Sequence, residues 1–222
     1  MAAGDTPYPS RSRGVVLSAG SGAGTVLVLR FDGRRDVRAL AGFDTVDVSG
    51  AEDIDAAATT ARRLIVVGSH ADLASVLTRL MRTERLDVEL AHAHGWGGAR
   101  RAVRAPARRV PLIRDDAGQA VVVAAEWRGT PETPMLTGEA IVDDASLFTG
   151  EVPGVRIEPT DRMPGLRAAV LSARGRPRGW VAGRAAQLGA VEALVVRDGV
   201  QAPRPVKRST FYRHTEGWLR VG

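Results

Sequence analysis

The chain has 222 residues, of which 44% are hydrophobic and 25% charged, so it is long enough for one or two globular domains and too apolar to be a disordered tail. It has no cysteine, which excludes disulfides, thiolate metal sites, iron–sulfur clusters and a cysteine nucleophile. The formal net charge is +6, but 30 of the 31 basic residues are arginine, a bias common in GC-rich genomes. The charge is therefore weak evidence for an acidic partner.

No segment of the sequence is apolar for long enough to cross a membrane as a helix. The longest apolar runs, such as residues 120–125, are far shorter than the roughly 20 residues that a bilayer requires. The N-terminus holds Asp5 and two prolines and has no basic stretch leading into an apolar run, so we expect no secretory signal. These features predict a cytoplasmic protein in which residues 1–13 form a mobile tail.

The first predicted elements are short strands and one helix. Residues 15–17 and 25–31 have the composition of strands on either side of the Gly-rich turn at 20–24. Another short strand is predicted at 45–48, followed by an Ala-rich helix at 51–61.

A strand–helix–strand unit is predicted over residues 64–92. Residues 64–67 are apolar on both faces, as expected for a parallel strand that helices cover on both sides. Residues 71–82 carry leucine and valine at helical spacing, with arginines on the opposite face. Residues 86–92 alternate as a strand does, which completes a βαβ unit whose crossover we expect to be right-handed.

Beyond residue 109 the pattern changes to short alternating runs separated by turns, and no helix is expected. Strands are predicted at residues 119–127, 138–142, 155–159, 166–171, 180–183, 193–197 and 211–221. The last run is expected to close the β-rich part. The predicted fold class is an N-terminal α/β (βαβ) domain at 14–99, an arginine-rich junction at 100–110 and an all-β, sandwich-like domain at 111–222.

Two turns could place main-chain N–H groups against a phosphate. The turn at 20–24 has three glycines but leads into a strand, so a flexible hairpin turn also explains it. The turn at 68–72 leads into a helix but has one glycine, and Ser69 or Asp72 could cap that helix without any ligand.

Three short motifs follow predicted strands. Val67-Gly68-Ser69-His70-Ala71 joins a strand to a helix, Gly95-Trp96-Gly97-Gly98-Ala99 follows the next strand, and Val196-Arg197-Asp198-Gly199-Val200 lies near the end. Together with the order of the parts they resemble the diacylglycerol kinase family of lipid kinases, which shares a two-domain fold with NAD kinases. The corresponding family motifs are Gly-Gly-Asp-Gly-Thr, a loop of the Gly-Thr-Gly-Asn-Asp type and Asp-Gly-Glu. The resemblance covers residues 25–222 and implies a cleft between two domains.

The chain departs from the family at positions that serve phosphoryl transfer. Ala71 has a Cβ where the family's glycine lets the main chain approach phosphate, the Asn-Asp pair is replaced by Gly-Ala, and Val200 replaces the glutamate. The resemblance therefore implies a pseudoenzyme, a non-catalytic binder of a small anionic or lipid-type ligand that needs no cofactor. The alternative is an active lipid kinase with relocated catalytic residues, which would use ATP and magnesium. The carboxylates left for that role are Asp72, Asp143, Asp144 and Asp198.

The histidines allow two interpretations. His92 and His94 share one face of their strand and His70 follows the neighbouring strand, so the three imidazoles could meet at the carboxyl edge of a parallel sheet and hold zinc. They could equally be ordinary histidines at strand ends, and no fourth ligand is evident, so we predict no metal site. Asp143-Asp144 could likewise be a paired-carboxylate site, although an Asx turn at the end of a strand explains both residues.

The predicted ligand site collects residues from the two strand ends and the arginine-rich junction. These residues are Gly68, Ser69, His70, Asp72, Gly95, Gly97 and Arg100. No catalytic residue is assigned. A nucleic-acid-binding module is a further alternative, which the +6 charge alone does not favour. It would require the basic residues of 100–109 and 204–213 to form one continuous surface.

Overall fold

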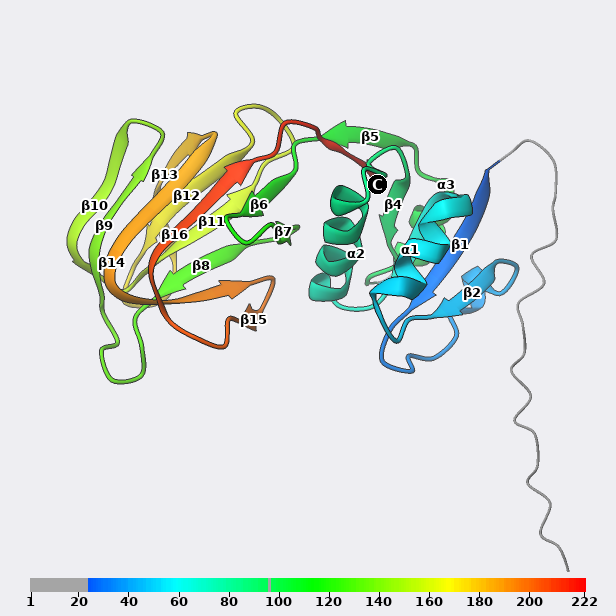
Figure 1. Ribbon diagram of the computed structural model, residues 1–222, viewed down its shortest axis with the longest axis horizontal. Coiled ribbons are helices and arrows are strands. Elements are labelled where there is room, and N and C mark those ends of the chain that lie inside the picture. Colours follow the sequence, from blue (N-terminus) through cyan, green and yellow to red (C-terminus); the bar gives the residue numbers. More distant parts are fainter. Residues whose placement is uncertain (1–23, 96) are drawn as a thin grey trace, which may run out of the picture.

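The structure, a computed structural model, describes residues 24–95 and 97–222. The chain forms two sheets that lie side by side, a mainly parallel sheet with helices and a larger antiparallel sheet (Figure 1). The expected tail at 1–13, the strand at 15–17 and all but the last residue of the turn at 20–24 lie outside the described residues. Within the described ranges, no helix has the length and hydrophobicity needed to cross a membrane.

The first sheet has six strands in the order β2-β1-β3-β4-β17-β5. Their bounds are Thr25–Arg30 for β1, Asp44–Asp47 for β2, Ala61–Val67 for β3, Glu89–His92 for β4, Ala107–Val110 for β5 and Trp218–Val221 for β17. All neighbouring pairs are parallel except β17 and β5, which are antiparallel. The parallel strands end at one edge, and that edge positions the candidate site.

Helices cover both faces of the first sheet. The helices are α1 (Ala51–Thr60), α2 (His70–Arg82), α3 (Gly98–Arg104) and the short 3₁₀ helix η1 (Arg38–Leu40). Alternate side chains of β3 point to opposite faces of the sheet. Leu64 and Val66 belong to the core under α1 and α2, whereas Ile65 and Val67 belong to the core under η1 and α3. The run of apolar residues in β3 is therefore buried on both faces, as the sequence predicts.

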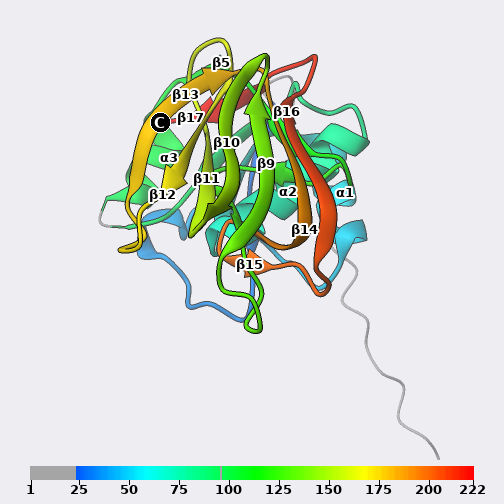
Figure 2. The ribbon, with the colours of Figure 1, turned by 90° about the vertical axis from the view of Figure 1, so that its left-hand side faces the viewer.

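The second sheet has eleven antiparallel strands that fold over one core (Figure 2). They are β6 (Ile113–Asp115), β7 (Ala120–Val121), β8 (Ala125–Arg128), β9 (Leu136–Val142), β10 (Ala145–Val152), β11 (Gly154–Pro159), β12 (Leu166–Leu171), β13 (Pro177–Gly183), β14 (Ala185–Arg197), β15 (Val200–Gln201) and β16 (Val206–Arg213). The long strand β14 pairs with two different strands. Its residues 186–190 pair with β9, and its residues 194–197 pair with β8.

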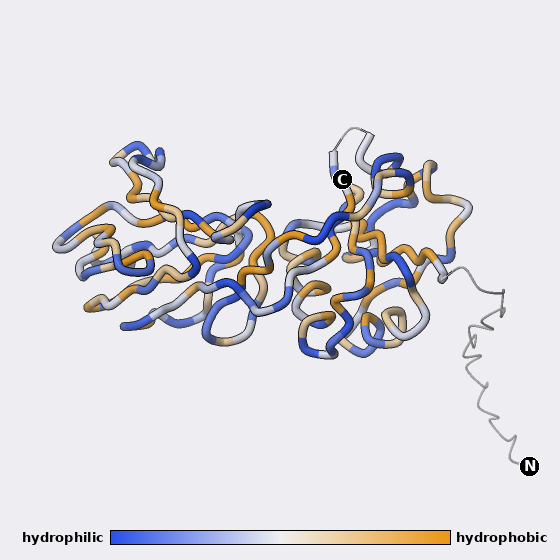
Figure 3. Tube along the Cα trace, turned by 90° about the horizontal axis from the view of Figure 1, so that it is seen from above, coloured by the Kyte–Doolittle hydropathy of each residue, from blue (hydrophilic) through white to orange (hydrophobic). Residues whose placement is uncertain are grey.

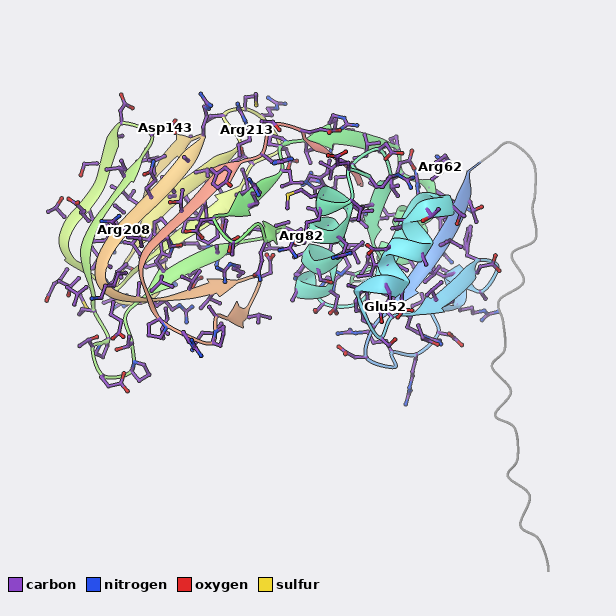
Figure 4. All side chains as sticks on the ribbon, viewed as in Figure 1. Glu52, Arg62, Arg82, Asp143, Arg208 and Arg213 are labelled. Carbon is purple, nitrogen blue, oxygen red and sulfur yellow. The ribbon has the colours of Figure 1, made fainter. Side chains whose placement is uncertain are left out.

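Each sheet has its own hydrophobic core, and the two parts meet where α2 packs against β7. The tube in Figure 3 shows hydrophobic stretches running through both parts. At the junction the Ala120 N–H donates to the Thr78 hydroxyl at 2.9 Å, and the Arg82 guanidinium donates to the Ala117 carbonyl at 3.3 Å. Arg82 projects from α2 toward the second sheet (Figure 4). The expected combination of an α/β part and an all-β part is confirmed.

The end of the chain differs from the prediction. The sequence predicts one strand at 211–221 that closes the β-rich part, and this is wrong. Strand β16 ends at Arg213, and β17 returns to the first sheet between β4 and β5. Trp218 is buried in the core under α1 and α2, and a Cβ on Gly217 would lie 2.4 Å from the Val110 carbonyl oxygen. Close packing against β5 therefore fixes where the chain enters the first sheet.

Other strands differ from the prediction in length. The run at 119–127 is divided into β7 and β8, and the run at 193–197 is the end of the longer β14. Strands β5, β6, β10 and β15 lie where the sequence predicts none. Each predicted helix is present within one residue at either end.

The position of β17 leads to a test of stability. Trp218 is 5% exposed, so Trp218→Ala removes a large buried side chain and should lower the free energy of unfolding by about 3–5 kcal/mol. Trp180 on β13 is only half-buried under the Arg167 guanidinium, which lies 4.2 Å from its ring centroid. Trp180→Ala should therefore cost about 1 kcal/mol or less. Urea denaturation of both variants measures the difference, and equal losses would contradict the placement of β17.

Candidate functional site

The turn from β3 into α2 is held by reciprocal hydrogen bonds between Ser69 and Asp72. The Asp72 carboxylate accepts the Ser69 N–H at 2.6 Å and the Ser69 hydroxyl at 2.8 Å. The Ser69 hydroxyl oxygen in turn accepts the Asp72 N–H at 3.2 Å, which forms a capping box. Both side chains that the sequence offers as phosphate or metal ligands in this turn are therefore used to start the helix.

Gly68 precedes this cap and packs directly against it. A Cβ at this position would lie 2.6 Å from the Asp72 carboxylate, so only glycine fits. Its carbonyl oxygen lies 3.0 Å from Nε2 of His92. Because a carbonyl can only accept, His92 carries its proton on Nε2 in this arrangement.

The three histidines expected at the sheet edge do come together. The ring centroids of His70, His92 and His94 lie 5.0, 4.9 and 5.0 Å apart. Burial lowers the pKa of His92, and the rings of His70 and His94 lower it further, while the Gly68 carbonyl and Asp72 raise it. Among residues 24–95 and 97–222, no group of three His, Cys, Asp or Glu side chains is placed to hold a metal ion.

Asp198 holds residues 122–124 of the second domain in place. It lies in the turn between β14 and β15, and its carboxylate accepts the N–H groups of Val122, Val123 and Ala124 at 2.7–3.1 Å. Burial raises the pKa of the Asp198 carboxyl, and the three N–H groups and His70 oppose that shift. The carboxylate therefore fixes the link between β7 and β8 beside the first domain.

A cavity of about 630 Å³ lies between the two parts, where α1, α2 and the segment after β1 face β7 and the β14–β15 turn. Most of its wall is apolar and comes from both parts. The apolar lining residues are Phe31, Val48, Ala51, Ile54, Ala71, Ala74, Ala120, Val200, Ala202 and Pro203. Of the described residues that line it, only Asp32 and Asp198 are carboxylates. Such a concave, mainly apolar site with a few charged groups is typical of a small-molecule site.

Three arginines give the cavity its positive charge, and two of them have carboxylate partners. Arg79 forms an ion pair with Asp55, and Arg197 forms one with the buried Asp115. In the part of the chain that the structure describes, the Arg82 guanidinium donates only to the main-chain carbonyls of residues 117 and 118. Its charge is therefore not neutralised by a carboxylate.

The predicted site residues lie at the same sheet edge but not in one cavity. Gly68, Ser69, His70 and Asp72 surround the start of α2, and Ala71 lines the large cavity. His70 and Asp198 line a smaller hollow of about 280 Å³ beside it. Gly95 and Gly97 have φ values of +68° and +74°, which glycine favours, and they precede α3 on the opposite face. Neither they nor the exposed Arg100 are among the described residues that line these two hollows.

Sequence reasoning missed most residues of the cavity wall. Arg79 and Arg82 appeared only as the polar face of a helix, and Asp32 lies in a turn that carries no motif. Spacing along α2 places Ala71, Ala74, Ser75, Thr78 and Arg82 on one side, and this is the signal that could have identified them.

Asp143 forms a turn. It has a φ of +52° between β9 and β10, and its carboxylate accepts the N–H groups of Arg184 and Ala185 at 3.0 Å. It lies at the upper edge of the second sheet, away from the first part of the molecule (Figure 4). The turn interpretation accounts for its contacts.

Comparison with solved structures identifies the fold. A diacylglycerol kinase from Bacillus anthracis is similar over 89% of this chain and 96% of its own, with a TM-score of 0.67 and 13% identity. An NAD kinase from Archaeoglobus fulgidus, solved in complex with ATP, is similar over 89% of this chain and 93% of its own, with a TM-score of 0.60 and 12% identity. Yeast NADH kinase complexed with NADH gives a TM-score of 0.52 and 10% identity, over 81% of this chain and 66% of its own.

The chain therefore has the two-domain fold of diacylglycerol kinases and NAD kinases, as the order of its motifs predicts. No protein-family model matches the sequence, and no curated protein is significantly similar to it. At 10–13% identity the likeness concerns the fold, so the chemistry has to be argued from the residues of this chain.

The role assigned to Asp198 can be tested by substitution. Asp198→Ala leaves three main-chain N–H groups without their acceptor and should lower the free energy of unfolding by about 2–4 kcal/mol. Asp144→Ala, at an exposed position in another turn, should change it by less than about 0.5 kcal/mol. Urea denaturation compares the two. If Asp198→Ala unfolds at the same urea concentration as the parent chain, the carboxylate has no structural role.

Proposed function

We propose that this protein is a non-catalytic, diacylglycerol kinase-like binder of an anionic or lipid-type ligand, which it holds in the cavity between its two domains. The fold supports a kinase-like ancestry, and a cytoplasmic location is part of the proposal. The observation that carries it is the state of the charged groups around the cavity. The carboxylates of Asp72, Asp143 and Asp198 hold turns together, whereas Arg82 has no carboxylate partner among the described residues.

Catalysis of phosphoryl transfer needs a metal-bound nucleotide and a base for the acceptor hydroxyl. Asp72 is engaged by Ser69, Asp198 by three N–H groups and Asp143 by Arg184 and Ala185. A carboxylate that holds a turn with two or three hydrogen bonds has fewer lone pairs left for magnesium, and it cannot move toward a metal without straining that turn. This arrangement favours binding over phosphoryl transfer.

The lining of the cavity fits a ligand with an apolar body and an anionic end. Apolar side chains from α1, α2 and residues 200–203 would cover the body. Arg82 would pair with the anionic end, because it lines the cavity and its guanidinium has N–H groups that the described main-chain carbonyls do not use. A short-chain phosphatidic acid has both features and is a suitable probe.

A charge-removing variant tests this assignment. Arg82→Gln should weaken binding of dihexanoyl phosphatidic acid by about tenfold, since a tenfold loss corresponds to about 1.4 kcal/mol, less than one charge-assisted hydrogen bond supplies. Arg85→Gln is the matched control, because Arg85 follows the same helix but pairs with Asp87 outside the cavity. Calorimetric titration measures both affinities. Equal affinities of the two variants, or no binding by the parent chain, would contradict the proposal.

The turn at 68–72 gives a second test, directed at nucleotides. Because Ala71 has a Cβ at the cavity wall, the parent chain should bind magnesium–ATP no more tightly than the high micromolar range. The triple change Ser69→Gly, His70→Asp and Ala71→Gly should raise that affinity. Calorimetry on both proteins measures the gain.

Two outcomes of the nucleotide test point elsewhere. Tight binding by the parent chain, with lipid-dependent ATP turnover lost in Asp72→Ala or Asp198→Ala, would establish the alternative of an active lipid kinase. No gain in the triple variant would mean that the cavity did not evolve from a nucleotide site. The nucleic-acid alternative would require the basic residues of 100–109 and 204–213 to act as one surface, although residues 107–110 belong to the first sheet and residues 206–213 to the second.

A further inference from the structure

A third hollow lies at the carboxyl ends of β4 and β17, away from the large cavity. Its volume is about 160 Å³, enough for a tetrahedral oxyanion. Two histidines, His92 and His94, and two arginines, Arg101 and Arg220, line it. No aspartate or glutamate is among its described lining residues. Open α/β sheets place ligands at this edge.

The charge of this hollow depends on whether its histidines are protonated. Arg220 already donates to the Asp161 carboxylate at 2.6 Å, so half of the arginine charge is neutralised. The other charged groups near the histidines come from each neighbouring element. They are Arg101 of α3, Asp72 of α2 behind His92, Asp198 facing His70 from the second domain, and Arg108 and Arg162 around Asp161. With all three rings neutral, Arg101 is the one arginine lining the hollow that has no carboxylate partner among the described residues.

The three histidine rings lie close enough together for added charges to interact. Their ring centroids lie about 5 Å apart, so two charged rings repel each other. The Gly68 carbonyl fixes the proton of neutral His92 on Nε2, so Nδ1 is the atom that can accept another. An anion in the hollow would compensate the added charge and remove the repulsion that otherwise opposes it.

We propose that this hollow is a proton-linked anion site, in which His92, His94 and Arg101 bind a tetrahedral oxyanion together with a proton taken up by the histidine cluster. The oxyanion is either free in solution or the phosphate of a lipid headgroup. The site is separate from the large cavity and does not depend on the proposed function. Burial lowers the pKa of His92, which favours the neutral ring when no anion is bound.

Calorimetry with sulfate tests the proposal, because sulfate keeps its charge over the pH range in which histidine titrates. Titrations in two buffers of different ionisation enthalpy give the number of protons taken up per bound sulfate. The expected uptake approaches one proton, and sulfate affinity should fall by up to about tenfold per pH unit as the pH is raised from about 6 to about 8. Dihexanoyl phosphatidylglycerol, a phosphodiester of constant charge, forms the second arm and distinguishes a headgroup from a free anion.

Substitutions assign the effect to the cluster. His94→Gln should weaken sulfate binding near pH 6 by at least about fivefold and reduce the proton uptake. Arg101→Gln, an exposed change on α3, should weaken binding at every pH and leave the proton uptake in place. His214→Gln is the matched control, because His214 lies between β16 and β17 and is not among the residues of the hollow.

Each result of these titrations supports or overturns the site. Binding of either probe with proton uptake that His94→Gln reduces supports it, and the probe that binds identifies the source of the anion. Binding without proton uptake, or with an affinity that is constant between about pH 6 and pH 8, overturns it. The absence of binding by both probes also overturns it. None of these results alters the expectation for Arg82 and phosphatidic acid, so the two proposals fail separately.

Discussion

The pair of Ser69 and Asp72 determines the geometry of the whole candidate site. Their reciprocal hydrogen bonds fix how β3 turns into α2, and the Asp72 carboxylate leaves no room for a Cβ on Gly68. This turn also directs the Gly68 carbonyl to His92 and places the His70 ring beside the rings of His92 and His94. Helix α2 then carries its remaining residues along the junction with the second sheet.

The consequence is a kinase-like fold whose acidic groups serve structure. Diacylglycerol kinases and NAD kinases share this arrangement of two domains, and here Asp72 and Asp198 hold the loops on either side of the cleft. What remains exposed to a ligand is an apolar wall, the charge of Arg82 and a group of histidines. These groups can bind an anion and cover an apolar body, and this combination is the physical basis of the proposed function.

The spacing of apolar residues predicted those elements whose burial depends on residues nearby in the sequence. The apolar run of β3 and the spacing of α2 reflect burial by immediate neighbours, so both were predictable. The place of Trp218 was not, because it depends on β5, more than a hundred residues earlier in the chain. The contacts of Asp198 also join segments about 75 residues apart. The convergence of the histidines followed from the rule that parallel strands end at one edge, whereas Arg82 looked like any solvated helix residue.

The central claim is that the carboxylates of Asp72 and Asp198 are committed to the fold and do not hold a metal–nucleotide. Paramagnetic broadening of amide NMR signals by Mn²⁺ with a non-hydrolysable ATP analogue measures this directly. The account predicts no selective broadening of the signals of residues 68–72 and 197–200 at nucleotide concentrations below the millimolar range. Selective loss of those signals, reversed by excess Mg²⁺, would show that Asp72 or Asp198 binds metal and would contradict the account.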